Sequence, residues 1–177
     1  MCSSDLFARL LDILVDVVAW HLVRQLEAGA DAVQIFDSWA GGLPEQEFTD
    51  WVVAPNKRVV AAVRKAIPSA KIIGFPRAAT QTGYEFYAAQ TDVDAVSIDT
   101  AASMPWAVKA LGGRLVLQGN LDPIALIAGG DALNRAVDHI LDATREVPFI
   151  FNLGHGILPE TPLEHVAQLV ARVRGVP

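Results

Sequence analysis

The feature that most constrains the fold of this chain is a regular alternation of short apolar runs with amphipathic segments. From Phe7 to Ala28, apolar residues recur at three- and four-residue spacing, which is typical of a helix with one buried face. Gly29 ends this segment, and the β-branched run from Asp31 to Phe36 then predicts a buried strand. The same pattern returns along the rest of the chain, so about five strand–helix units are expected.

The later elements are predicted from the same signals. Further strands are expected at residues 71–75, 95–98, 115–118 and 148–152. Helices are expected at residues 47–66, 82–90, 104–111, 131–144 and 162–174, with a short helix after Pro123. Buried strands separated by helices require a parallel sheet, because each crossover helix returns the chain to the same end of the sheet. The chain is therefore predicted to be α/β.

Two α/β architectures fit this pattern, namely part of an eight-unit (β/α)8 or TIM barrel and a doubly wound sheet. The doubly wound dinucleotide-binding fold carries a G-x-G-x-x-G turn after a strand, and none of the expected strands is followed by one. The pattern therefore favours a partial barrel. A chain of 177 residues fits one domain, and residues 7–177 are assigned to it.

The first six residues, MCSSDL, lack the periodicity of the segment that follows them. The stretch from Cys2 to Leu6 matches the translation of TGCTCTTCCGATCT, the end of a common sequencing adapter. We therefore predict that residues 1–6 are a non-native leader and that the natural protein continues upstream. Cys2 is the one cysteine of the chain, so neither an internal disulfide nor a zinc site built on thiolates is expected.

Charge and hydropathy limit the partners of this chain. The net charge is -6 and no cluster of Lys and Arg is present, which argues against nucleic acid. The apolar runs IIGF and LVLQG are far shorter than the roughly 20 residues that cross a bilayer, and no signal peptide precedes them. A cytoplasmic protein without a nucleic-acid or membrane partner is therefore expected.

Polar residues gather at the carboxyl ends of the expected strands, where a parallel barrel carries its active site. The residues at these ends are Asp37 and Ser38, Pro76 and Arg77, Asp99, Asn120 and Asp122, and Asn152 and His155. The strand starts carry Asp31, Lys71, Asp94 and Arg114, which suit solvent-facing loops. This difference between the two ends predicts a functional site at the carboxyl ends.

Three motifs at these ends resemble the uroporphyrinogen decarboxylase family. They are IFDSWAG from Ile35, LQGNLDP from Leu117, and FNLGHGI ending at Ile157, in the family's order and spacing. The resemblance implies the C-terminal part of a TIM barrel that belongs to a homodimeric carboxy-lyase. The family removes carbon dioxide from the four acetate arms of uroporphyrinogen to give coproporphyrinogen on the route to haem, without a metal or organic cofactor.

The resemblance places the family's substrate-binding serine at Ser38 and its binding histidine at His155. A serine hydroxyl donates one hydrogen bond to a carboxylate, and an imidazole donates from either nitrogen. Arg77 is a candidate substrate contact, because no other Lys or Arg of the fourteen is expected at the carboxyl end of a strand. The family's arginine motif, its pyrrole-binding aspartate and its tyrosine belong to the N-terminal half, so the catalytic residues are unknown here.

Structural roles compete with these assignments. Ser38 also suits the cap of a following turn, and Arg77 also suits a surface ion pair. Asn120 and Asp122 are interpreted as structural, with Asp122 capping a helix that begins at Pro123. Asp99 has no assigned role, because Thr100 follows it where the family commonly has tryptophan. Three tryptophans are expected to pack between helices, namely Trp39, Trp51 and Trp106.

Two other functions are left open by the sequence. A zinc-dependent corrinoid or coenzyme M methyltransferase of the related barrel family needs a thiolate ligand, and Cys2 alone could supply it. A non-catalytic half-barrel that binds or assembles is the second alternative. An uroporphyrinogen pocket also needs cations for eight carboxylates, and Arg77 alone does not provide them. The chain by itself is therefore predicted to hold an incomplete site.

Overall fold

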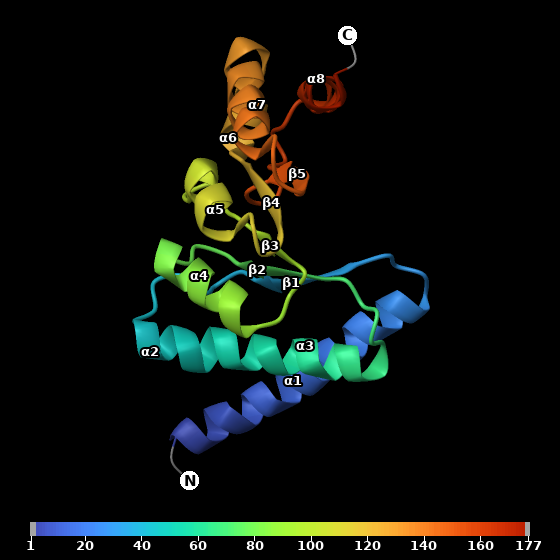
Figure 1. The fold of residues 1–177 in the computed structure, drawn as a ribbon, viewed down its shortest axis with the longest axis vertical. Coiled ribbons are helices and arrows are strands. Elements are labelled where there is room, and N and C mark those ends of the chain that lie inside the picture. Colours follow the sequence, from blue (N-terminus) through green and yellow to red (C-terminus); the bar gives the residue numbers. More distant parts are fainter. Residues whose placement is uncertain (1–2, 176–177) are drawn as a thin grey trace. The chain divides into compact units, whose positions relative to one another are not determined.

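The computed structural model describes residues 3–175, in which helices and parallel strands alternate (Figure 1). The strands are β1 (Val33–Asp37), β2 (Ile72–Pro76), β3 (Ala95–Ser97), β4 (Val116–Leu121) and β5 (Phe149–Leu153). The helices are α1 (Ser3–Glu27), α2 (Glu45–Phe48), the π-helical turn η1 (Thr49–Val53), α3 (Ala54–Ala66), α4 (Gln81–Gln90), α5 (Met104–Leu111), α6 (Pro123–Ala128), α7 (Gly130–Thr144) and α8 (Leu163–Arg174). The strand order is β1-β2-β3-β4-β5. The predicted α/β fold with a parallel sheet is confirmed.

The chain divides into two compact units, one ending at Ala95 and one beginning at Val96. In the first unit, α1 packs against α3, and both lie on the same side of β1 and β2 (Figure 1). Val33 and Ile35 of β1 are buried, whereas the next residue, Phe36, is 68% exposed. Alternate residues of a strand point to opposite faces, so β1 turns one face to the helices and leaves the other open. The open face differs from the expected burial on both sides.

Strand β2 lies close to α4 because it carries a glycine at its centre. A Cβ atom at Gly74 would lie 2.5 Å from Cε1 and 2.6 Å from the hydroxyl of Tyr87, whose side chain is fully buried. Any larger residue would have to push this ring aside in a packed interior. Gly74 therefore fixes the depth at which the Tyr87 hydroxyl sits.

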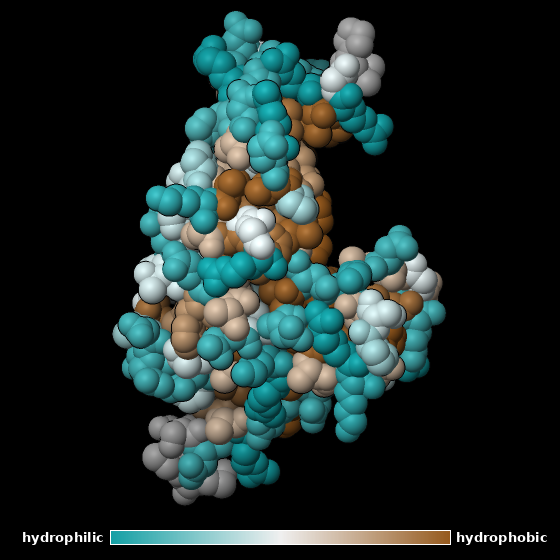
Figure 2. All heavy atoms as spheres, in the orientation of Figure 1, coloured by the Kyte–Doolittle hydropathy of each residue, from teal (hydrophilic) through white to brown (hydrophobic). Residues whose placement is uncertain are grey.

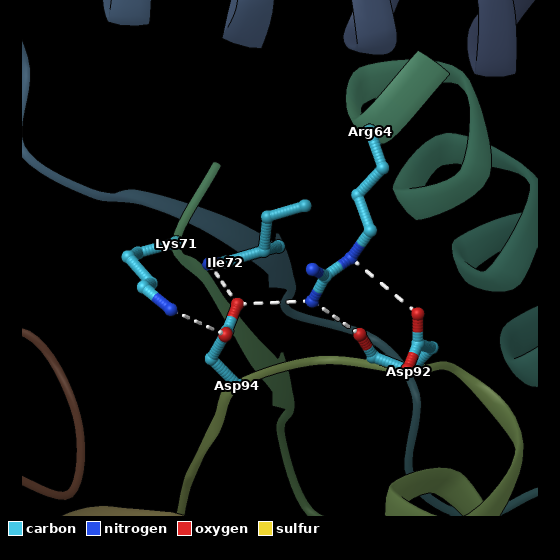
Figure 3. Close-up of polar contacts among 5 residues, drawn as sticks. All are labelled: Arg64, Lys71, Ile72, Asp92 and Asp94. Atoms are coloured by element: carbon cyan, nitrogen blue, oxygen red, sulfur yellow. Dashed lines mark hydrogen bonds and ion pairs between the residues drawn. The ribbon is translucent and has the colours of Figure 1, made fainter. Parts of the chain in front are cut away.

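A cluster of charged side chains lies at the amino ends of β2 and β3 (Figure 3). Asp94 accepts hydrogen bonds from the Ile72 backbone N–H at 2.9 Å and from Arg64 Nη2 at 3.0 Å. Lys71 Nζ lies 3.3 Å from the other oxygen of Asp94. Lys71 and Asp94 lie at the starts of β2 and β3, as predicted.

The second unit is built on the parallel pair β4 and β5, in which Leu117 pairs with Phe149 and Leu121 with Leu153. Helix α7 packs on α5, α8 and β4, and its buried residues Leu133, Val137 and Ile140 form one apolar stripe. By contrast, β5 has no fully buried residue and neither has α8. Figure 2 shows apolar surface over β5 and on α8. The residues of this surface include Ile150, Leu163 and Val170.

The fold differs from the expectation in three main respects, while the remaining element boundaries agree to within two residues. Helix α1 begins at Ser3 rather than near Phe7, and β4 extends to Leu121, so Asn120 lies inside the strand rather than after it. The third difference is η1, which interrupts the helix expected at residues 47–66. Among residues 3–175, no helix is both long and apolar enough to span a membrane.

Replacing Gly74 by alanine is expected to lower the free energy of unfolding by about 1–3 kcal/mol, because the new methyl group overlaps the Tyr87 ring. Gly113 is the matched control, since nothing lies within 4 Å of its Cβ position. Gly113→Ala is expected to change stability by less than about 0.5 kcal/mol. Urea unfolding followed by circular dichroism measures both, and equal losses in the two variants would contradict this account of β2.

Candidate functional site

Ser38 and Arg77 lie side by side at the carboxyl ends of β1 and β2. The strand register pairs Asp37 with Pro76, so the next residue of each strand falls at the same level. The Arg77 backbone N–H donates to the Asp37 carbonyl at 3.0 Å. Arg77 Nη1 donates to the Ser38 carbonyl at 3.1 Å. Two of the three predicted site residues therefore lie together within the first unit.

Gly41 allows the loop after β1 to contact the turn after β2. A Cβ atom at Gly41 would lie 2.5 Å from both the Cβ and the carbonyl oxygen of Ala78. Ala78 itself has a φ of 60°, which places it in the left-handed region. The glycine of the IFDSWAG motif is thus required by a close approach of two backbones, and this approach holds Ser38 against Arg77.

The loop after β1 presents polar and aromatic groups to solvent. Ser38 is exposed, and within residues 3–175 its hydroxyl has no hydrogen-bond partner. The alternative that Ser38 caps the next turn therefore finds no support in these contacts. The expectation that Trp39 packs between helices is wrong, since its side chain is 87% exposed. Within residues 3–175, it lies in the exposed loop that follows β1.

Asp37 is supported by two buried residues, Asn56 and Tyr87, that were not identified from the sequence. Asn56 Nδ2 donates to Asp37 Oδ2 at 3.1 Å and to the Val52 carbonyl at 2.8 Å. The Tyr87 hydroxyl donates to Asn56 Oδ1 at 3.2 Å. A signal for Asn56 was present, because it interrupts the apolar face that Val52 and Val59 define in this helical segment.

Burial governs the ionisation of this network. It raises the pKa of the Asp37 carboxyl, and the hydrogen bonds from Asn56 and from the Trp39 backbone offset part of that rise. Burial also raises the pKa of the Tyr87 phenol, and the nearby charge of Asp37 adds to the effect. Tyr87 is therefore a neutral hydrogen-bond donor throughout the physiological pH range.

Arg77 differs in its partners from the cations that are paired with an acid. Arg24, Arg58, Arg64, Lys71, Arg145 and Arg172 each form an ion pair with an acid. Within the described part of the chain, no carboxylate lies in ion-pair range of Arg77, so the alternative of a surface ion pair is not found. A guanidinium has five N–H donors, and the contact with the Ser38 carbonyl leaves others for a ligand.

In the second unit, His155 follows the carboxyl end of β5. Its side chain is exposed, and Nδ1 accepts a hydrogen bond from the Gly156 backbone N–H at 2.7 Å. An imidazole nitrogen that accepts carries no proton, so this bond assigns the proton of the neutral ring to Nε2. The structure thus presents His155 as a donor through Nε2.

Gly154, which precedes His155, is required by a close approach of two backbones. A Cβ at Gly154 would lie 2.5 Å from the Thr100 backbone nitrogen. The Gly154 N–H donates to the Leu121 carbonyl at 2.8 Å. Gly154 therefore serves a close approach of backbones that places the histidine loop on the end of β3.

The other polar residues at these strand ends have structural partners. Asn120 Nδ2 donates to the carbonyls of Asp99 and Ala102, at 3.1 and 2.6 Å. Asp122 caps α6 by accepting from the Ile124 N–H at 2.9 Å, which confirms the structural interpretation of both residues. Asp99 is buried, and its carboxylate accepts from the Ala101 N–H at 2.9 Å. It shapes its own turn.

Metal ligands do not cluster in the described residues. Among residues 3–175, no three His, Cys, Asp or Glu side chains are placed to hold one ion. Cys2, the thiolate that a zinc site would need, lies outside the residues that the structure describes.

Comparison with solved structures identifies the fold class of the chain. The chain superposes over 98% of its length on 50% of a methyltransferase from Methanosarcina mazei, with a TM-score of 0.79 and 23% sequence identity. At this identity the likeness concerns the fold alone. Together with the parallel sheet and the polar carboxyl ends, it assigns the chain to the partial (β/α)8 barrels, as predicted.

The family follows from the sequence. The uroporphyrinogen decarboxylase (URO-D) family profile matches residues 2–176, and the chain belongs to this family. A uroporphyrinogen decarboxylase of Sphingopyxis alaskensis is 47% identical over 169 residues, covering 96% of this chain and 49% of the relative. The proteins of that name from Rhizorhabdus wittichii and Rhodospirillum rubrum are 49% and 45% identical, covering 96% of this chain and 49% of each. The chain spans about half the length of the curated relatives it matches.

We expect Asp37→Asn to stabilise the protein progressively as the pH rises. Because the folded-state pKa of Asp37 is raised, stability is lost as the pH climbs from the unfolded value of 3.8 through the folded pKa. Asparagine does not titrate, so the advantage of the variant should grow across that window and then level off. The groups facing Asp37, which are Asn56, Tyr87 and the Trp39 amide, stay neutral there.

Asp138→Asn is the control with the opposite sign. The hydrogen bond from Arg172 lowers the pKa of Asp138, so its stabilising effect is present above the unfolded pKa and is lost as the pH falls. Urea unfolding at a series of pH values from about 3.5 to 7 compares the two variants with the native sequence. Parallel pH profiles for the two variants would contradict the assigned shifts.

Proposed function

We propose that this chain supplies the C-terminal half of a uroporphyrinogen decarboxylase, which converts uroporphyrinogen to coproporphyrinogen in haem biosynthesis. Relatives that carry this name and are 45–49% identical support the proposal. The structural observation that carries it is the contact of Arg77 with the Ser38 carbonyl at the ends of β1 and β2. It sets a hydroxyl and a guanidinium side by side, as a substrate rich in carboxylates requires.

Ser38 and Arg77 act on the substrate as hydrogen-bond donors in this proposal. The exposed serine hydroxyl donates to one carboxylate oxygen, and the remaining N–H groups of Arg77 add charge-assisted bonds. His155 serves the same purpose from the second unit through its Nε2–H. All three groups bind and orient carboxylate arms, and none of them serves as a nucleophile.

The proposed reaction needs a proton and an electron sink, and the substrate provides the sink. Protonation of a pyrrole ring carbon creates an iminium, and the bond between the acetate CH2 and its carboxylate then breaks. Carbon dioxide leaves, while the bonding electrons enter the ring and form an exocyclic methylene. Protonation of this methylene and loss of the ring proton give the methyl product. The residues of this chain contribute by holding the arms in place, which is electrostatic preorganisation.

The partners of the reaction are proposed to belong to the rest of the enzyme. Eight carboxylates need more cations than Arg77, and the catalytic residues are assigned to the N-terminal half that the relatives possess. No metal or organic cofactor is proposed. The complete enzyme is proposed to be a cytoplasmic homodimer.

The proposal is tested in a complete enzyme made by fusing residues 7–177 to the N-terminal half of the Sphingopyxis alaskensis relative, hereafter the joined protein. It is expected to release carbon dioxide from uroporphyrinogen and to form coproporphyrinogen, measured by chromatography of the oxidised porphyrins. A folded joined protein without this activity would contradict the proposal.

In the joined protein, His155→Ala is expected to raise the KM for uroporphyrinogen by about 10-fold or more, as the loss of a hydrogen bond to a charged group implies. The melting temperature should change little, because the imidazole is exposed. His139→Ala, which also removes an exposed histidine, is the matched control and should leave KM unchanged. A fall in stability as large as that of a core cavity, with an unchanged KM, would contradict a binding role.

Residues 1–177 made alone are expected to be inactive and to self-associate. β1 leaves one side of its backbone unpaired within the described strands, as does β5, and such edges pair readily with other chains. Light scattering coupled to size-exclusion chromatography measures the mass. A monomer that decarboxylates uroporphyrinogen would refute both parts of this expectation.

A further inference from the structure

We infer that Asn56 and Tyr87 are positioning residues for substrate binding, which act by holding Asp37 and thereby set the place of Ser38 and Arg77. This inference rests on the proposed function, because it assigns a purpose to the support beneath the same site. Neither residue touches the exposed surface of the loop, since Asn56 is 5% and Tyr87 0% exposed.

Strand geometry separates the support from the site. Val33 and Ile35 are buried on the helix face of β1, and Phe36 is exposed on the other face. Continuing this alternation places the Asp37 side chain on the helix face, where Asn56 of α3 contacts it. Ser38 then falls on the open face together with Phe36. The carboxylate is thus anchored on one side of the sheet while the hydroxyl is offered on the other.

The orientation of Asn56 is fixed by its three hydrogen bonds. Its amide nitrogen donates to Asp37 Oδ2 and to the Val52 carbonyl, and its amide oxygen accepts from the Tyr87 hydroxyl. Rotating the amide by half a turn would direct its oxygen at a carboxylate and a carbonyl, which are both acceptors. Tyr87 supplies the donor that favours the observed orientation, and Gly74 leaves room for its ring.

The anchored residue connects to both proposed ligands through the backbone. The Asp37 carbonyl accepts from the Arg77 N–H at 3.0 Å, and the adjacent Ser38 carbonyl accepts from Arg77 Nη1 at 3.1 Å. A tilt of the Asp37 peptide would therefore displace the serine and the guanidinium together. Misplacing two donors by a fraction of an ångström weakens carboxylate binding, because hydrogen bonds depend steeply on geometry.

The first test is Tyr87→Phe in the joined protein, which removes the hydroxyl and keeps the ring that fills the space at Gly74. KM for uroporphyrinogen is expected to rise about three- to tenfold while kcat stays within about twofold. The matched control is Thr144→Val, which also removes a buried hydroxyl bonded to a carbonyl, that of Ile140 in α7. It should lower stability without changing KM.

A purely structural network would give a different result. Tyr87→Phe would then lower the melting temperature as Thr144→Val does, and KM would stay at the value of the native sequence. That outcome overturns the inference. Failure of the proposed function is distinct, because the joined protein of native sequence would then itself lack decarboxylase activity.

A second measurement does not depend on activity. Hydrogen exchange by NMR in the joined protein compares the amide of Arg77, shared between the Asp37 and Phe75 carbonyls, with the amide of Asp94, bonded to the Ile72 carbonyl. Tyr87→Phe is expected to speed exchange at Arg77 several-fold and to leave Asp94 unchanged. Equal rates at Arg77 in the native sequence and the variant would overturn the inference whether or not the enzyme is active.

Discussion

The polar network of the first unit is organised around a half-buried carboxylate at the end of a strand. An ionised group in such a place is costly unless hydrogen bonds satisfy it, and Asn56 of α3 and the Trp39 backbone supply them to Asp37. Other features follow from this requirement. Tyr87 must reach Asn56 from α4, and Gly74 must lack a side chain so that the ring fits. The need to satisfy the Asp37 carboxylate thus accounts for the residues found at three positions, namely Asn56 of α3, Tyr87 of α4 and Gly74 of β2.

The same unit separates its charges between the two ends of its strands. At the amino ends, Arg64 and Lys71 are paired with Asp92 and Asp94, so neither cation is left without an acidic partner (Figure 3). At the carboxyl ends, Arg77 contacts only the neutral Ser38 carbonyl among the described residues, so its positive charge stays available. The Arg77 guanidinium at this end can therefore form charge-assisted hydrogen bonds with an anionic ligand. This agrees with the proposed substrate, which carries carboxylates on every ring.

Much of the fold could be predicted because periodicity and β-branched runs are local signals. Strand ends could be placed to within a few residues, which sufficed to bring Ser38 and Arg77 together and to put His155 after β5. Asn56 carries a local signal, a polar residue on an apolar helix face, but neither its partners nor the role of Tyr87 could be predicted, because they depend on a contact between two helices that lie far apart in the sequence. The exposure of Trp39 was mispredicted for the same reason, since burial of a loop residue depends on which element covers it.

Thr100 is the one noted departure from the family pattern, and it bears on how His155 is placed. A Cβ at Gly154 would meet the backbone nitrogen of Thr100 at 2.5 Å before it met the threonine methyl group at 2.8 Å. The need for glycine therefore arises from the backbone at position 100 and does not depend on the side chain there. The backbone contact that seats the loop carrying His155 therefore does not require a particular side chain at position 100. The side chain of Thr100 itself is exposed beside this loop.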